Sequence, residues 1–268
     1  MSRLSRRFVE KPWGKDTLPA PFVAPAGERI GEVWFDPPPE MASILVKYIF
    51  TSEQLSVQVH PSDEQAAELH EADGGKDECW LVIDAEPGAR LGIGFKQDVD
   101  IETIRRAALD GSIEGLLAWH PVRAGDFFHL PAGTVHAIGA GVTLIEVQQN
   151  SDITYRLYDY GRPRELHLDK GLAVASGAPH DPALRRHLSM SETVELVRGR
   201  YFTVNLVSGA LPDLMRAVSG QSCLVIPLTG QVALDPACLL VPGDCGFVTP
   251  AANVGFEPAG SCLVVKPA

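Results

Sequence analysis

Residues 123–138 read RAGDFFHLPAGTVHAI, in which two apolar, strand-like runs flank a turn that contains proline and glycine. Residues 241–256, VPGDCGFVTPAANVGF, repeat the same order of Gly-Asp, apolar pair, proline, turn and strand. An internal repeat of a strand–turn–strand unit predicts a duplicated β-barrel. The second copy has Val254 where the first has His136, so we expect it to lack the polar residue of the first.

Short strand-like segments also occupy most of the sequence on either side of this repeat. SILVKYIF (43–50) and LSVQVH (55–60) are rich in β-branched and aromatic residues, and further short strands separated by Gly and Pro follow residue 200. Many short strands at regular intervals are typical of a barrel or sandwich, so the predicted fold class is mainly β. Ser62 and Gln65 form a possible capping box for a short helix that fades at Gly74-Gly75.

We expect two structural units. Residues 1–176 are predicted to form the first barrel, together with N-terminal strands and a helical insertion at about residues 98–120, where apolar residues recur at helical spacing. Residues 177–268 are predicted to form a second, degenerate barrel. The stretch from about residue 177 to residue 187 contains Pro179 and Pro182 and is interpreted as a linker or crossover.

Composition and charge argue against several classes of function. The 268-residue chain carries a formal net charge of -11, which disfavours nucleic-acid binding through a basic face. We find neither a signal-peptide pattern nor a run approaching the roughly 20 apolar residues that span a bilayer, so no membrane insertion is expected. The five cysteines are odd in number and lack CxxC spacing, which indicates reduced thiols and a cytoplasmic protein.

Four polar residues that are distant in the sequence form a candidate metal site. Gln58 and His60 share one face of a strand, because strand side chains alternate between faces. Glu78 opens the next strand, and the tight turn before His136 can direct that side chain into the barrel mouth. Two imidazoles and a carboxylate are the ligand set of a catalytic zinc site, which an amide oxygen or water can complete. The same set also suits Fe(II) in an oxygenase.

Four ordered motifs resemble those of a known family. The sequence is similar to the type I mannose-6-phosphate isomerases, specifically their short bacterial form, within the cupin superfamily. The matching segments are SVQVHPSDE (56–64), GKDECWLV (75–82), GDFFHLPAGTVHAIG (125–139) and LIEVQQNSDITYRLYDYGR (144–162). The resemblance covers roughly residues 11–170, and it implies a cupin β-barrel and an aldose–ketose isomerase.

The resemblance also implies roles for individual residues. Family members hold one zinc ion per chain, and the matching ligands here are Gln58, His60, Glu78 and His136. Substrate-contacting and catalytic groups of the family fall at Ser56, Lys76, Glu146 and Arg156, and a second basic residue of the pocket falls at Arg162. The implied reaction interconverts mannose 6-phosphate and fructose 6-phosphate through an enediol.

The residues themselves support these roles while leaving alternatives open. Lys76 lies two positions before Glu78, so both point into one cavity if the segment is extended, unless the two preceding glycines turn the lysine outward. Arg156 is flanked by apolar and aromatic residues and needs an anion, either Asp159 or a substrate phosphate. Glu146 can transfer a proton if it faces inward, or is a solvated glutamate if it faces outward.

We therefore expect a metal-dependent isomerase of sugar phosphates, with Arg156, Lys76 and Glu146 as catalytic residues. Ser56, Lys76, Arg156 and Arg162 are the expected substrate-binding residues. The alternatives are a metal-binding cupin that acts on another sugar phosphate, a cupin oxygenase, and a sugar-binding cupin without turnover. Either a monomer or a homodimer is compatible with exposed barrel edges.

Overall fold

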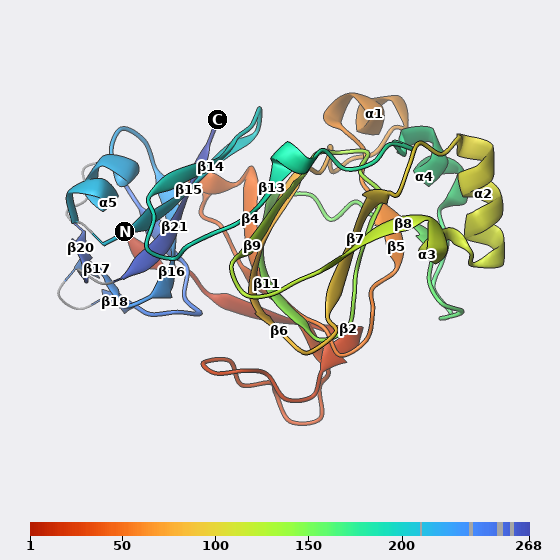
Figure 1. Ribbon diagram of the computed structural model, residues 1–268. Helices are drawn as coiled ribbons and strands as arrows, with labels where there is room; N and C mark the ends of the chain where they lie inside the picture. The colour runs from red at the N-terminus through yellow and green to blue at the C-terminus, as the bar shows by residue number, and fades with distance from the viewer. Residues whose placement is uncertain (210, 236–237, 251–253, 258–259) are drawn as a thin grey trace.

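The structure is a computed structural model that describes residues 1–209, 211–235, 238–250, 254–257 and 260–268. Strands dominate it and group into two units that lie side by side (Figure 1). The larger unit contains a seven-stranded and a five-stranded sheet, and the smaller unit contains a six-stranded and a three-stranded sheet. The predicted mainly β class is confirmed, although the two sheets of each unit are not joined into a closed barrel.

The seven-stranded sheet lies between the pocket of the larger unit and the core shared with the smaller unit. Its order is β13-β9-β6-β11-β4-β3-β2. All seven residues of β4 are buried, because alternate side chains pack on opposite faces of this central strand. The strands are β2 (Arg6–Lys15), β3 (Ile30–Phe35), β4 (Ile44–Phe50), β6 (Glu78–Ala85), β9 (Asp126–Leu130), β11 (Val142–Gln149) and β13 (Arg185–His187).

The five-stranded sheet forms the opposite wall of the larger unit. Its order is β12-β5-β10-β7-β8. The outer face of this sheet packs against helices, so that Val57, Val135 and Leu157 share one apolar cluster with Ile104 and Leu172. The strands are β5 (Val57–Val59), β7 (Arg90–Phe95), β8 (Leu117–Pro121), β10 (His136–Ile138) and β12 (Tyr155–Tyr158).

The smaller unit is built from the first residues and the last third of the chain. Its six-stranded sheet has the order β1-β19-β16-β21-β15-β14, and its three-stranded sheet has the order β18-β17-β20. Val254, which replaces the histidine of the first repeat, is buried among apolar side chains in this unit, while residues 251–253 of the repeat lie outside the described residues. The strands are β1 (Ser2–Arg3), β14 (Val194–Arg198), β15 (Phe202–Ser208), β16 (Cys223–Thr229), β17 (Val232–Asp235), β18 (Cys238–Leu240), β19 (Gly246–Val248), β20 (Gly255–Phe256) and β21 (Ser261–Pro267).

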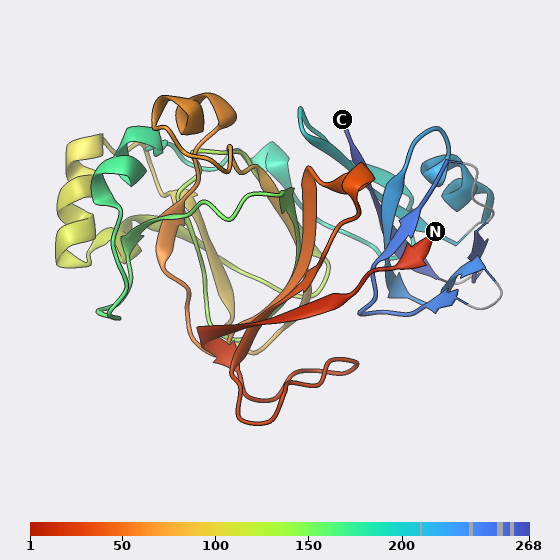
Figure 2. The ribbon, with the colours of Figure 1, turned by 180° about the vertical axis from the view of Figure 1, so that it is seen from behind.

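Short helices cover one end of the larger unit, as the view from behind also shows (Figure 2). The expected helical insertion at about residues 98–120 differs from the structure at its end. Gly111, at φ 82°, ends the first helix, and the segment from Leu117 onward pairs with β7 as strand β8. The helical elements are η1 (Pro39–Met41), α1 (Asp63–Glu68), α2 (Ile101–Asp110), α3 (Ile113–Leu116), α4 (Leu168–Val174), η2 (Pro182–Leu184) and α5 (Leu211–Val218).

The predicted capping box at the start of α1 is confirmed. The Oγ atom of Ser62 accepts a hydrogen bond from the backbone N–H of Gln65 at 3.2 Å, and Oε1 of Gln65 accepts one from the backbone N–H of Ser62 at 2.9 Å. The helix ends at Glu68, before the glycine pair that was expected to end it. This cap fixes the chain direction immediately after His60 and Pro61.

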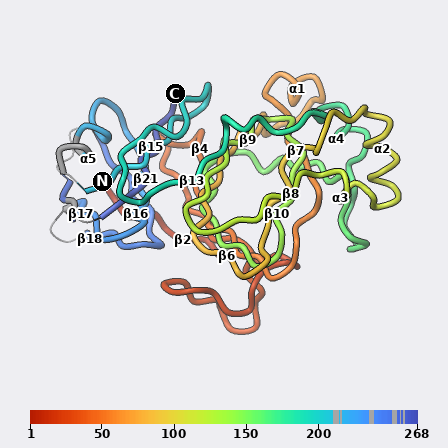
Figure 3. The backbone as a smooth tube through the Cα atoms, in the orientation of Figure 1, coloured from red at the N-terminus to blue at the C-terminus, as the bar shows by residue number. Residues whose placement is uncertain are grey.

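The two units exchange strands across the expected boundary at residue 176. Strand β1 pairs with β19 of the smaller unit, and β13 pairs with β9 of the larger unit. The backbone N–H groups of Phe95 and Val99 bond to the carbonyl oxygens of Ala178 and Gly177, so the expected linker begins by packing on the larger unit. Figure 3 shows the chain passing from β13 into the smaller unit, which contains β15. The division into two units at residue 176 stays a prediction.

Two further expectations concern the state of the cysteine thiols and membrane insertion. Of the five cysteines, Cys238 is partly buried and the other four are buried, and all are free thiols. No helix in the described part of the chain has the length and apolar character that a membrane span requires.

Replacing Gly75 by alanine is expected to destabilise the protein by about 1–3 kcal/mol, because the added methyl group would clash with backbone. A Cβ at this position would lie 2.4 Å from the backbone nitrogen of Asp63 and 2.5 Å from the carbonyl carbon of Ser62. Denaturant titration measures the loss. Gly115→Ala is the control, since a Cβ there has no atom within 4 Å. Equal stability of the two variants would contradict the packing argument.

Candidate functional site

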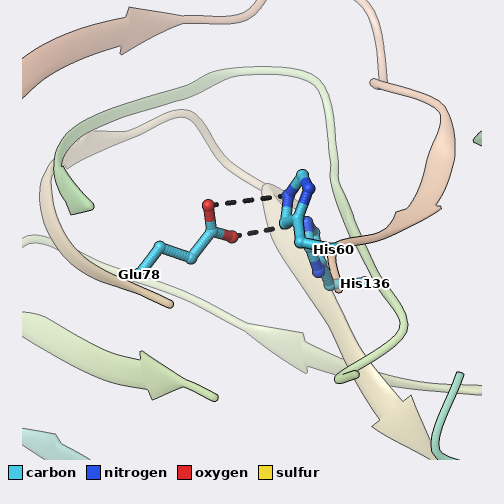
Figure 4. Close-up of side chains that lie close together, drawn as sticks. All are labelled: His60, Glu78 and His136. Atoms are coloured by element: carbon cyan, nitrogen blue, oxygen red, sulfur yellow. Dashed lines mark ion pairs between the residues drawn. The ribbon is translucent and has the colours of Figure 1, made fainter. Parts of the chain in front are cut away.

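Three strands bring the predicted metal ligands together inside the larger unit. Strands β5 and β10 are antiparallel neighbours, and their register places Gln58 opposite His136. His60 follows the end of β5 on the same face as Gln58, as the strand alternation predicts. Glu78 begins β6 in the facing sheet and points across the gap toward both imidazoles (Figure 4).

His60, Glu78 and His136 offer donor atoms that all lie within 4.8 Å of one another. The Nε2 atom of His60 lies 3.7 Å from Oε2 of Glu78, and Nε2 of His136 lies 3.4 Å from Oε1 of the same carboxylate. All three residues are buried. Among the described residues, this is the one cluster of His, Cys, Asp and Glu with such spacing.

Backbone carbonyl groups fix the orientation of both imidazoles. Nδ1 of His60 donates to the carbonyl oxygen of Ile153 at 2.7 Å, and Nδ1 of His136 donates to that of Thr134 at 2.9 Å. Burial lowers the pKa of His136 to about 4, and burial together with the charge of Lys76 lowers that of His60. Both rings are therefore neutral at pH 7, with the Nε2 lone pairs directed at Glu78, which is the arrangement typical of metal-ligating histidines.

The Glu78 carboxylate has an ammonium group on one side and is still positioned to bind a cation between the two imidazoles. Neither of its oxygens has a hydrogen-bond donor among the described residues, although Oε2 lies 2.7 Å from Nζ of Lys76. Burial raises the pKa of Glu78 to about 7, against the opposing charge of Lys76. A divalent cation beside the two neutral imidazoles would favour the ionised carboxylate, so the residues present fit a metal ion.

Gln58 and Ser56 line the adjacent side of this site. The Gln58 amide nitrogen lies 3.2 Å from Nε2 of His136, and its Oε1 accepts a hydrogen bond from Oγ of Ser56 at 3.1 Å. The Gln58 amide is therefore within reach of the metal cluster, as predicted, and rotation of the amide would present its oxygen to a cation.

Lys76 points into the larger unit rather than outward from the glycine pair. The lysine is buried, and its Nζ atom lies 3.2 Å from Nε2 of His60 and 3.7 Å from Oε1 of Glu146. It stands between the two carboxylates of the site, because it also contacts Glu78. The two-residue spacing of Lys76 and Glu78 therefore predicted their shared face correctly.

Glu146 also faces inward, where positive charge surrounds it. Its Oε1 atom lies 2.8 Å from Nζ of Lys47 on the neighbouring strand, and its Oε2 accepts a hydrogen bond from Nε1 of Trp80 at 3.0 Å. Burial alone would raise the pKa of Glu146, but the charges of Lys47 and Lys76 outweigh it and lower the pKa. The buried Glu146 is thus ionised, and the alternative of an outward, solvated glutamate does not describe it.

Gln58, Lys76 and Glu146 line one pocket with an empty volume of about 620 Å³. Arg156 lines it, and no carboxylate in the described part of the chain lies within 4.0 Å of its guanidinium. The predicted alternative partner, Asp159, instead binds Arg162 and Arg164. The other lining residues are Lys11, Trp13, Glu32, Lys47, Ile49, Leu55, Ser56, Gln58, Lys76, Ile138, Glu146, Asp152, Thr154 and Arg164.

The structure does not bring Arg162 into this pocket. Its guanidinium bonds to Asp159 and donates to the carbonyl oxygen of Gln54 at 2.8 Å, while Arg164 lines the pocket. Lys47 was also not singled out from the sequence. The available signal was a single charge in the apolar run SILVKYIF, where the strand pattern alone predicts burial on both faces.

Comparisons with known proteins agree with this geometry. No family model matches the chain. A protein named probable mannose-6-phosphate isomerase GmuF, from Bacillus subtilis strain 168, is 36% identical over 259 residues, which cover 88% of this chain and 80% of the relative. The mannose-6-phosphate isomerase of Streptococcus mutans is 41% identical over 169 residues, which cover 60% of this chain and 53% of that protein.

A solved structure extends the likeness to the whole fold. The crystal structure of the mannose 6-phosphate isomerase from Bacillus subtilis superimposes with a TM-score of 0.80 at 25% identity and covers 99% of both chains. The solved structure therefore shares the overall fold of this chain. The chain therefore belongs to the mannose-6-phosphate isomerase family.

Proposed function

We propose that this chain is a metal-dependent aldose–ketose isomerase that interconverts mannose 6-phosphate and fructose 6-phosphate. The observation that carries the proposal is the buried cluster of His60, Glu78 and His136 at a pocket whose lining includes the unpaired Arg156. The relatives' names supply the reaction and the substrate. A simple sugar-binding protein has no need of the buried Lys76 and Glu146 beside a metal site.

We propose one zinc ion per chain, held by His60, Glu78 and His136 with the amide of Gln58. Two imidazoles and a carboxylate suit zinc, and an amide oxygen completes the shell. When bound, the ion would orient and polarise the hydroxyl and carbonyl oxygens of the open-chain sugar. The basic lining of the pocket favours an anionic substrate over the neutral or apolar substrates of many oxygenases.

The chain's own residues provide the substrate grip and the proton transfer. Arg156 is placed to bind the phosphate group, since a planar guanidinium donates two parallel hydrogen bonds to phosphate oxygens. Ser56 contributes a hydroxyl on the same wall of the pocket. Moving the carbonyl group from C1 to C2 requires that a proton leave C2 and that a proton be returned to C1. Nζ of Lys76 and Oε1 of Glu146 lie 3.7 Å apart and are the proposed proton-transfer atoms.

Lys47 is placed to keep Glu146 ionised, as its proposed role in proton transfer requires. Burial alone would lower the pKa of Lys47, but the charges of Glu146 and Glu32 more than offset burial and raise it. Because Lys47 stays charged, it keeps Glu146 in the ionised form. The ionised carboxylate can accept a proton from the substrate and then return it.

The remaining proposals concern the state of the protein in the cell. We propose a cytoplasmic protein that is a monomer or a homodimer and that binds neither nucleic acid nor membrane. The net charge of -11 and the five free cysteines support this assignment. We also propose that residues 1–176 carry the catalytic machinery and that residues 177–268 form a degenerate second cupin unit.

The decisive experiment is an isomerase assay on the purified chain. Mannose 6-phosphate is expected to give fructose 6-phosphate, a chelator is expected to stop conversion, and added Zn²⁺ is expected to restore it. Parallel reactions with glucose 6-phosphate and ribose 5-phosphate test substrate specificity. Oxygen consumption by the Fe(II)-loaded protein would identify an oxygenase instead. Tight binding of sugar phosphates without conversion, with metal bound, would identify a non-catalytic cupin and would refute the proposed function.

Metal affinity is expected to fall by roughly tenfold between pH 8 and pH 6, since each ligand must be deprotonated to bind. The pKa of Glu78 in the metal-free fold is raised to about 7, whereas that of His136 is lowered to about 4, so Glu78 is the group that competes with protons in this range. Titration of Zn²⁺ against a competing chelator at the two pH values measures the change. An affinity that does not vary would show that Glu78 ionises at lower pH or does not bind the metal.

A further inference from the structure

A second arginine borders the pocket beside Arg156. Arg164 lines the same cavity, and its side chain is about one-quarter exposed, at 24%. The resemblance to the isomerase family implies a pocket role for Arg162 instead, which lies two residues earlier in the same loop. The two arginines of this loop differ in what their guanidinium groups contact.

Asp159 holds Arg164 in place with two strong hydrogen bonds. The buried carboxylate accepts from Nε of Arg164 at 2.6 Å and from its NH2 at 2.6 Å, which is the bidentate geometry of a fixed guanidinium. These bonds use one edge of the planar group. The remaining nitrogen, NH1, has no hydrogen-bond partner among the described residues and belongs to a side chain that lines the pocket.

The guanidinium of Arg162 contacts other parts of the protein rather than the pocket. It shares the Asp159 carboxylate at 2.9 Å and donates from NH2 to the carbonyl oxygen of Gln54 at 2.8 Å. Its guanidinium carbon also lies 5.5 Å from the centroid of the Tyr160 ring, in the range of a cation–π contact. Its charge is therefore used to tie the loop to the segment before β5. A substrate group would have to break these contacts to reach it.

Arg156 and Arg164 are close enough to interact unfavourably. Burial, followed by the positive charge of Arg164, lowers the pKa of Arg156. Asp152 also lines the pocket, but it forms no ion pair with either arginine within the described residues. Two neighbouring guanidinium groups, one without a carboxylate partner, form a site that a multiply charged anion would stabilise.

We propose that Arg164, positioned by Asp159, is a second phosphate-binding residue that acts together with Arg156, and that Arg162 is structural. The inference rests on the proposed function, because it assigns the phosphate end of the proposed sugar-phosphate substrate. Phosphate would bridge the two guanidinium groups and relieve their repulsion. Arg164 then binds substrate, whereas Asp159 acts through Arg164 as a positioning residue.

Arg164→Gln tests the proposal, with Arg162→Gln as the matched comparison because both residues bind Asp159. We expect Arg164→Gln to raise KM for mannose 6-phosphate and the inhibition constant of inorganic phosphate by about 10- to 100-fold, the value of a charge-assisted hydrogen bond. The kcat value and the metal content are expected to change far less. Arg162→Gln is expected to affect thermal stability more than either phosphate-dependent constant. An equal or larger phosphate effect in Arg162→Gln would overturn the assignment.

Two more variants control for loss of folding and test whether Asp159 positions Arg164. Arg164→Lys keeps the charge but cannot bind Asp159 and phosphate with one planar group, so a phosphate inhibition constant between those of wild type and Arg164→Gln is expected. Asp159→Asn is expected to weaken phosphate binding as well. The double variant Asp159→Asn with Arg164→Gln should bind phosphate no more weakly than Arg164→Gln alone. Additive losses would refute positioning through Arg164.

Direct calorimetric titration with inorganic phosphate separates this inference from the proposed function. If wild type converts no sugar phosphate, the proposed function fails, yet phosphate binding that depends on Arg164 would still support the arginine pair. If wild type is an isomerase and Arg164→Gln binds inorganic phosphate as tightly as wild type does, the inference fails while the proposed function stands.

Discussion

Glu78→Gln is expected to abolish stoichiometric metal binding and to reduce isomerase activity by at least about 100-fold, more than the loss typical of an outer-shell substitution. The glutamine keeps the size of the side chain but removes the charge that faces the two neutral imidazoles of His60 and His136. Metal content measured by atomic emission and turnover of mannose 6-phosphate provide the two readings.

The control for this variant is Glu64→Gln. Glu64 lies on α1 and forms an exposed ion pair with Arg200, so its replacement should leave both readings at the wild-type level. The glutamine can still accept a hydrogen bond from Lys76, whose Nζ atom lies 2.7 Å from Oε2 of Glu78, so the variant is expected to stay folded. Full metal occupancy in Glu78→Gln would mean that the metal ion binds without the Glu78 carboxylate.

Arg156→Ala is expected to lower kcat/KM for mannose 6-phosphate by about 100-fold or more, the loss typical of removing one stabilising group from an active site. The reason is that the unpaired guanidinium of Arg156 is placed to bind the phosphate group. Metal content should stay unchanged, because Arg156 is not among the three clustered metal-binding side chains. Steady-state kinetics and metal analysis on the same preparation measure both effects.

Arg105→Ala serves as the comparison for loss of an arginine. Arg105 lies on α2 and pairs with Asp169 at the surface. It should retain wild-type kinetics. A fully active Arg156→Ala would remove Arg156 from the mechanism and leave Arg164 as the main candidate for phosphate binding.

The strand period explains why much of the site could be predicted from the sequence. Gln58 and His60 are two residues apart, as are Lys76 and Glu78, and alternation alone places each pair on one face. The turn before His136 likewise identified a side chain directed into the fold. The local pattern was sufficient for these residues, since the side chains of each pair share a face as strand alternation requires, and the register of β5 and β10 places Gln58 opposite His136.

Other features depended on contacts that no local pattern contains. Residues 117–121 continue a helical segment in the sequence, but pairing with β7 makes them strand β8. Lys47 became recognisable only when the pairing of β4 with β11 placed it opposite Glu146. The guanidinium of Arg162 bonds to Gln54, whereas the side chain of Arg164 lines the pocket. Nothing in the sequence distinguishes these two arginines.

The exchange of β1 and β13 between the two units has a consequence for how the molecule folds. A single apolar cluster contains Tyr48 and Phe127 of the larger unit together with Phe202, Leu224 and Leu263 of the smaller unit. Neither half can gain its full buried surface until the other is present, so unfolding is expected to be cooperative across the whole chain. A fragment cut at the middle would expose this surface and tend to aggregate.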